Sequence, residues 1–378
     1  MSGPTPETQP SPAPDGWIYD DAPQQSLRVR ALRLARIGAS GLVLSTAGAS
    51  YQATGDFTFF ADSSIATAAS LLQECDDPDV SDIDQQIRQF QRTDSYTDPG
   101  TDLFDNLEDY GNFMVGQFQE KTGLTFYDAT TTIEALDEAS TIGEVMEITD
   151  GFTQQYGVRL LSEEEVRSAS GESAVGFSLR FGPQPIGFEA PSDTEAEDED
   201  IRFTAMQVVY SLSRMPQEII QYSQLQRLAL VSNIHMEEQE LSGVWVRAPY
   251  GDALMVLTVD SPFFADFAFN HELFHGIDIK DCGSLSIASD SVFSQAASDR
   301  YYWIGDAVYP TDYAETGGTG EYKAELFADI FDGNLFMDPD SADYQSPLAI
   351  RQRLILARLE NIAPGITQHA LALQAWHD

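Results

Sequence analysis

The chain has few basic residues for its length. Its 378 residues include 61 aspartates and glutamates against 20 lysines and arginines, for a formal net charge of -41, and lysine occurs only as Lys121, Lys280 and Lys323. Such a surface repels nucleic-acid phosphates and anionic membranes, so neither is an expected partner. It suits a medium of high ionic strength, where salt screens the repulsion between like charges.

Cysteine is scarce as well, since only Cys75 and Cys282 occur. The pair permits one Cys75–Cys282 disulfide, which would tie the segment around Cys282 to the N-terminal region, or two buried thiols. Neither cysteine belongs to a Cys-x-x-Cys pair, and this excludes a zinc ribbon.

The sequence lacks an apolar run long enough for an ordinary membrane span. Residues 37–49 are apolar and end in small residues, and Arg28, Arg30, Arg33 and Arg36 precede them. A basic segment, a short apolar segment and a small-residue end are typical of a secretory signal. We therefore expect residues 27–49 to be a signal-like segment of a secreted or cell-surface protein, with a cytoplasmic protein as the alternative. Residues 1–26 are proline-rich and predict a disordered tail.

The remaining residues have the composition of a folded protein, with 42% hydrophobic and 11% aromatic residues over the chain. We expect a mainly helical region over residues 50–135 and a second domain over 136–378. Periodicity predicts helices over 64–72, 82–90, 105–123, 142–156, 201–222 and 347–360, and strands over 158–161, 227–231, 243–246 and 254–259. The acidic run 193–200 predicts an exposed, mobile loop.

One short motif carries a definite chemistry. Residues 271–275 read His-Glu-Leu-Phe-His, the H-E-x-x-H pattern, in a chain with five histidines. On a helix, residues four apart share a face, so His271 and His275 can hold one metal ion while Glu272 lies beside a water on that ion. A chance match is expected well under ~0.01 times in such a chain. His235, His369 and His377 carry no motif and are expected at the surface.

A catalytic zinc site of this kind needs a third protein ligand. After a glycine-rich loop, residues 321–331 predict a helix with Glu321 and Glu325 on one face, and either carboxylate could reach the metal. Asp281 is a further alternative, six residues after His275, but it lacks the glycine that would turn the chain toward the metal. Asp278 lies on the same helical face as the histidines and is expected to have a supporting role.

Together these motifs resemble the glutamate-zincins, the group of metallopeptidases related to anthrax lethal factor and the Mlc titration factor peptidases. The resemblance covers about residues 215–335. It implies that Glu321 is the third zinc ligand and that Tyr313 points into the site. The loop from Tyr313 to Glu321 is one residue longer than in the family, which leaves Glu325 as the alternative ligand; otherwise Glu325 would accept a hydrogen bond from a ligand histidine.

We therefore predict an α+β, zincin-like metallopeptidase core, a small sheet plus metal-binding helices, behind a mainly helical N-terminal region. The expected activity is that of a zinc-dependent endopeptidase, in which Glu272 is the general base for a zinc-activated water and Tyr313 donates to the oxyanion. In folds of this type the edge strand beside the metal binds the substrate as an added strand. The alternative is a catalytically silent zincin scaffold that binds a partner at the cell surface.

Overall fold

The structure is a computed structural model. It describes residues 80–90, 118–162, 164–166, 180–181, 184–185, 187–191, 195–236, 239–247, 253–260, 264–282, 293, 308–316, 319–332, 334–335 and 342–377, and all of these belong to the unit Ile37–Asp378. The predicted tail, the signal-like segment, the helix over 64–72, most of the helix over 105–123 and Cys75 lie outside the described residues. The side chain of Cys282 does too, so the predicted disulfide stays a prediction.

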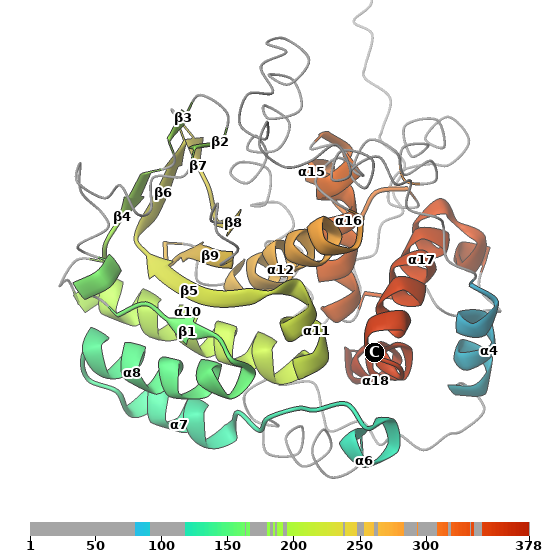
Figure 1. The fold of residues 1–378 in the computed structure, drawn as a ribbon, viewed down its shortest axis with the longest axis horizontal. Helices are drawn as coiled ribbons and strands as arrows, with labels where there is room; N and C mark the ends of the chain where they lie inside the picture. Colours follow the sequence, from blue (N-terminus) through green and yellow to red (C-terminus); the bar gives the residue numbers. More distant parts are fainter. Residues whose placement is uncertain are drawn as a thin grey trace, which may run out of the picture. The chain divides into compact units, whose positions relative to one another are not determined.

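The chain is a mixed α+β protein, mostly helical with a small mixed sheet (Figure 1). The helices are α4 (Ser81–Phe90), α6 (Gln119–Thr122), α7 (Thr130–Glu138), α8 (Ile142–Thr153), α10 (Glu195–Arg214), α11 (Gln217–Ser223), α12 (Ala265–Cys282), α15 (Asp312–Thr316), α16 (Thr319–Phe331), α17 (Pro347–Ile362) and α18 (Ile366–His377), with 3₁₀ helices η3 (Gln154–Tyr156) and η7 (Ala342–Gln345). The strands are β1 (Arg159–Leu160), β2 (Arg180–Phe181), β3 (Gln184–Pro185), β4 (Gly187–Glu189), β5 (Leu225–Val231), β6 (Asn233–Met236), β7 (Gln239–Glu240), β8 (Gly243–Arg247) and β9 (Ala253–Thr258).

The main sheet has the strand order β1-β5-β9-β8. β5 is parallel to both of its neighbours, whereas β8 is antiparallel to β9 and ends the order. Because successive strand residues point to opposite faces, Leu228 and Leu230 join the large helical core while Ala229 and Val231 join a second apolar cluster. The second cluster also contains residues of the sheet β4-β6-β7, so the main sheet is buried on both faces.

α12 lies between the main sheet and α16 (Figure 1). It contacts β8 and β9 on one side and α16 on the other, and α10 and α11 also pack against it. The same core includes Ile83 of α4 and Ile133 of α7, so the described helices before residue 135 pack together with those that follow. α4 is held to the C-terminal helices by Asp84, which accepts from Tyr344 Oη at 2.6 Å and pairs with Arg353 Nε at 3.3 Å.

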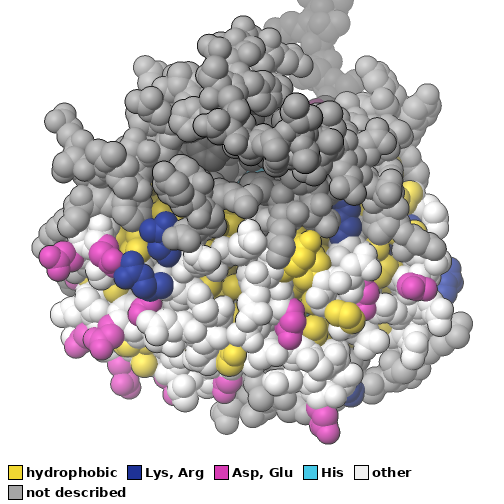
Figure 2. Space-filling model, in the orientation of Figure 1, with side chains coloured by type: hydrophobic (Ala, Val, Ile, Leu, Met, Phe, Trp, Pro, Cys, Tyr) yellow, Lys and Arg dark blue, Asp and Glu magenta, His cyan; other side chains and the backbone are white. Residues whose placement is uncertain are grey.

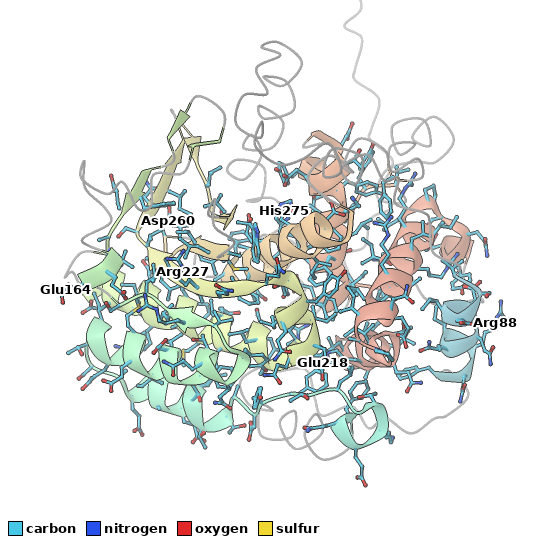
Figure 3. All side chains as sticks on the ribbon, in the orientation of Figure 1. Arg88, Glu164, Glu218, Arg227, Asp260 and His275 are labelled. Carbon is cyan, nitrogen blue, oxygen red and sulfur yellow. The ribbon has the colours of Figure 1, made fainter. Side chains whose placement is uncertain are left out.

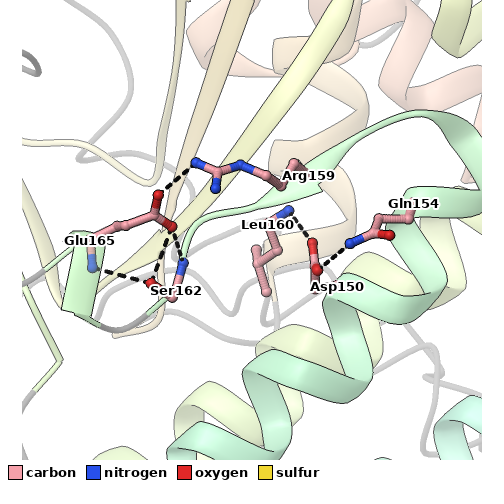
Figure 4. Close-up of polar contacts among 6 residues, drawn as sticks. All are labelled: Asp150, Gln154, Arg159, Leu160, Ser162 and Glu165. Carbon is pink, nitrogen blue, oxygen red and sulfur yellow. Dashed lines mark hydrogen bonds and ion pairs between the residues drawn. The ribbon is translucent and has the colours of Figure 1, made fainter.

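The two-residue strand β1 is fixed by polar contacts at both ends (Figure 4). Asp150 of α8 accepts from the Leu160 amide at 2.8 Å and also from Gln154. Beyond the strand, Glu165 accepts from the Ser162 amide at 2.9 Å and pairs with Arg159 at 2.7 Å. Such side-chain contacts hold the α8–β1 connection at the sheet margin, where a strand this short has few ladder bonds of its own.

Two sequence predictions for this region were wrong. The acidic run does not form a loop throughout, because α10 begins at Glu195 and includes residues 195–200. Carboxylates in the first turns are favoured by the positive end of the helix dipole, which offsets their mutual repulsion. The helix predicted over 201–222 is two helices, since α10 ends at Arg214 and Pro216, which has no amide proton, precedes α11.

The structure also differs at one histidine and at the C-terminus. His369 is fully buried and contacts the rings of Phe118, Phe126 and Phe331, so its prediction as a surface residue was wrong. It lies on α18, a helix that the sequence analysis did not predict. The helix over 82–90 and the strands over 227–231, 243–246 and 254–259 are confirmed within one or two residues as α4, β5, β8 and β9.

On the face shown in Figure 2, acidic side chains are spread over the described surface and do not form a single patch. Within the described part of the chain, no helix is both long and apolar enough to cross a bilayer.

Candidate metal centre

The two motif histidines lie one turn apart on α12 and are buried. Their rings turn Nε2 toward each other, with 3.1 Å between the two atoms. Figure 3 shows His275 on α12, on the part of the helix between the sheet and α16. A helix packed on several sides fixes these rings, since neither can move without disturbing the core.

Glu321 reaches the same point from α16. Its Oε2 lies 3.0 Å from Nε2 of His271 and 3.7 Å from Nε2 of His275. Among the described residues, these three side chains form a group whose donor atoms lie close enough to hold one metal ion. The predicted third residue is therefore brought to the two histidines by α12–α16 packing, across 46 positions of sequence.

The donor set fits a metal ion. Ligand atoms about 2.0–2.2 Å from a tetrahedral metal lie about 3.3–3.6 Å from each other, and the three separations here are 3.0, 3.1 and 3.7 Å. Buried lone pairs that converge in this way repel unless a proton or a cation lies between them. The site could therefore hold a metal ion.

Glu325, one turn after Glu321, approaches the opposite nitrogen of His271. Its Oε1 lies 3.0 Å from Nδ1. An acceptor at this position keeps the proton on Nδ1. The lone pair of Nε2 is then directed at the place between the three donor atoms where a metal ion could bind. Of the two glutamates, Glu321 therefore belongs to the group that could hold a metal ion, whereas Glu325 contacts the opposite nitrogen of His271.

Glu272 lies beside the donors and is also buried. Burial raises the pKa of Glu272, while the charges of His275 and His271 and a hydrogen bond from the Trp245 amide act in the opposite direction. Trp245 belongs to β8, and a Cβ on Gly243 of the same strand would lie 3.0 Å from Cγ of Glu272. The carboxyl group of Glu272 is therefore enclosed between α12 and β8.

The histidines and Glu321 share a strong local field. Burial lowers the pKa of His271, but Glu321 and Glu325 outweigh it and raise that pKa well above its ordinary value. Burial likewise opposes the charge of Glu321, yet His275 and His271 outweigh it and lower the pKa of Glu321. The negative charges of Glu321 and Glu325 that favour a proton on His271 would also favour a bound cation.

Tyr313 of α15 lies near the histidines, with its ring centroid 6.1 Å from that of His271. Burial, and then the charge of Glu321 and a hydrogen bond with it, raise the pKa of Tyr313 far above its ordinary value. The raised pKa favours the neutral phenol, which keeps its proton for donation in a hydrogen bond while its oxygen can still accept one.

Asp278 of α12 forms an ion pair with a buried lysine of α16. Lys323 Nζ lies 2.6 Å from Asp278 Oδ1, and the lysine is fully buried. This ion pair joins α12 to α16 close to the donors, which fits the supporting role predicted for Asp278. Asp281 lies in α12, but its side chain is outside the described part of the structure.

Gly276 lets the Trp245 ring of β8 pack directly against α12. A Cβ at this position would lie 2.4 Å from Cζ2 of Trp245 and 2.9 Å from the Ser223 carbonyl oxygen. The Trp245 ring thus packs directly on the helix backbone next to His275, and only glycine leaves it room.

The comparisons with protein families, with curated proteins and with solved structures give no match for this chain. The sequence analysis missed Trp245, Lys323 and Thr311, whose contacts join segments distant in the chain. The one sequence signal for any of them was the scarcity of lysine, because one of the three lysines of the chain lies in the predicted helix over 321–331.

Proposed function

We propose that the protein is a zinc-dependent endopeptidase with a zincin-like core. The observation that supports this most strongly is the buried group of His271, His275 and Glu321 with the carboxyl group of Glu272 next to it. Zinc is the proposed metal, because two imidazole nitrogens and one carboxylate form a donor set of catalytic zinc sites with an open fourth position, and because both histidines come from an H-E-x-x-H motif on one helix.

A bound zinc ion would supply Lewis-acid polarisation of a water molecule and of the peptide carbonyl. Glu272, enclosed by α12 and β8, accepts the proton of the attacking water and passes it to the leaving amine. Burial raises the pKa of Glu272, which strengthens its carboxylate as a base. Tyr313 donates a hydrogen bond to the oxygen that becomes negative during attack.

The substrate would lie along β8. Among the described strands, β8 ends the sheet order and pairs only with β9. Its residues Gly243 and Trp245 lie next to Glu272. An extended peptide added to such an edge would be held by backbone hydrogen bonds, with a peptide carbonyl brought to the metal point. This mode needs an unfolded or extended segment in the substrate.

Glu272→Gln tests the proposal and separates it from a silent metal-binding scaffold. The substitution keeps the size of the side chain and both histidines, so zinc content should stay at the wild-type value. Cleavage of unfolded protein should fall by at least ~100-fold, the usual contribution of a positioned acid–base group. Wild-type protein that holds zinc but cleaves no member of a broad peptide library would favour the scaffold. Equal activity in the variant would mean that the cleavage belongs to another site or to a contaminant.

A further inference from the structure

The hydroxyl group of Thr311 links the start of α15 to α16 beside the metal donors. Thr311 precedes α15, and its Oγ1 donates to Oε2 of Glu325 at 2.6 Å. The same oxygen accepts from the Ala314 amide at 3.0 Å. A hydroxyl has a single proton, so donation to the carboxylate leaves its lone pairs for the amide. The residue therefore caps α15 and holds Glu325 of α16 at the same time.

The contacts continue to the metal donors. The other oxygen of Glu325 lies 3.0 Å from Nδ1 of His271. A continuous series of hydrogen-bonded groups thus runs from the first turn of α15, through Thr311 and Glu325, to a histidine of the metal group. Tyr313 is the second residue of α15, so the cap that holds this turn also places the phenol near His271.

We propose that Thr311 is a positioning residue that couples the orientation of His271 to the placement of α15 and Tyr313. A metal ion on Nε2 would further restrict the packed ring of His271, and through Nδ1 it would stabilise the position of Glu325 and of the Thr311 hydroxyl that caps α15. Metal binding should then stabilise the first turn of α15 and, with it, the position of Tyr313 near His271. The inference rests on the metal site of the proposed function but not on its peptidase activity.

Zinc affinity, measured by competition with a chromophoric chelator, tests the first half. Thr311→Val keeps the shape and removes the hydroxyl, and it should weaken zinc binding about tenfold, the lower end of the range for groups that orient a ligand. Thr311→Ser should retain the wild-type affinity. In a Glu325→Ala background Thr311→Val should cause no further loss, because the group through which it acts is gone.

Amide hydrogen exchange at Ala314 tests the second half. Zinc should slow this exchange in the wild-type protein and leave it unchanged in Thr311→Val. Thr367→Val is the matched control, because Thr367 Oγ1 donates to Glu360 at 2.9 Å at the start of α18, a similar pair outside the metal group. It should lower stability and leave zinc affinity unaltered.

The outcomes separate the inference from the proposed function. If the wild type binds zinc but Thr311→Val keeps full affinity, or if zinc does not alter exchange at Ala314, the coupling is refuted and the peptidase proposal stands. If both responses occur yet no peptide is cleaved, the coupling stands and the peptidase proposal falls. A wild-type protein without zinc affinity would refute both.

Discussion

Replacing Gly276 with alanine should destabilise the protein, although helix propensity alone predicts the opposite. Gly-to-Ala in a helix interior is favourable by about 1 kcal/mol. Here the new Cβ would lie 2.4 Å from Cζ2 of Trp245, 2.5 Å from Cη2 and 2.9 Å from the Ser223 carbonyl oxygen. Forcing one carbon into a packed core costs about 1–3 kcal/mol, and a backbone oxygen cannot swing aside as a flexible side chain could. Because the contact with the Ser223 backbone oxygen puts the cost in the upper part of that range, we expect a net loss of up to about 2 kcal/mol.

Urea unfolding of metal-free protein measures this change in the free energy of unfolding. Gly151→Ala in α8 is the matched control, because a Cβ there meets nothing within 4 Å and should stabilise the protein by about 0.5–1 kcal/mol. The opposite signs of the two substitutions are the prediction. If Gly276→Ala stabilised the protein as much as Gly151→Ala does, the packing of Trp245 on α12 would be wrong, and with it the position of β8 beside Glu272.

Two further predictions concern the glutamates and the buried histidine. Glu325→Ala should weaken zinc binding about 10 to 100-fold, and Glu321→Ala should weaken it more because a ligand is lost; chelator competition compares them, and the reverse order would mean that Glu325 is the ligand. Burial lowers the pKa of His369 from 6.5 to about 3, so between these values the unfolded chain binds a proton that the folded protein does not. Stability should therefore fall as the pH decreases through this window, and in His369→Gln that slope should be shallower by about 1.4 kcal/mol per pH unit; identical slopes would contradict the buried neutral ring.

The sequence was most informative where local spacing determines geometry. Four-residue spacing on a helix placed His271 and His275 on one face, and the same spacing put Glu321 and Glu325 on one face of α16. Apolar runs rich in β-branched residues likewise predicted the strands β5, β8 and β9, because this pattern is a property of each strand alone. These features depend on one element at a time, so they could be predicted without knowledge of packing.

Features that depend on contacts between distant segments could not be predicted. His369 was placed at the surface because its burial comes from rings on α16 and on residues 118–126, which only the folded chain brings together. The hydrogen bonds from the Trp245 amide to Glu272 and from Thr311 to Glu325 are likewise between separate elements. The error at the acidic run had another cause, because net charge was given more weight than the favourable interaction of carboxylates with a helix N-terminus.

Zinc stoichiometry tests the central claim most directly. Protein purified without chelator, loaded with zinc and freed of excess metal should contain about one zinc per chain by elemental analysis. His271→Ala should retain almost none under the same treatment, whereas His369→Gln, which removes a buried histidine elsewhere in the core, should retain the full amount. A wild-type protein without stoichiometric zinc, or a His271→Ala protein that keeps it, would contradict the account.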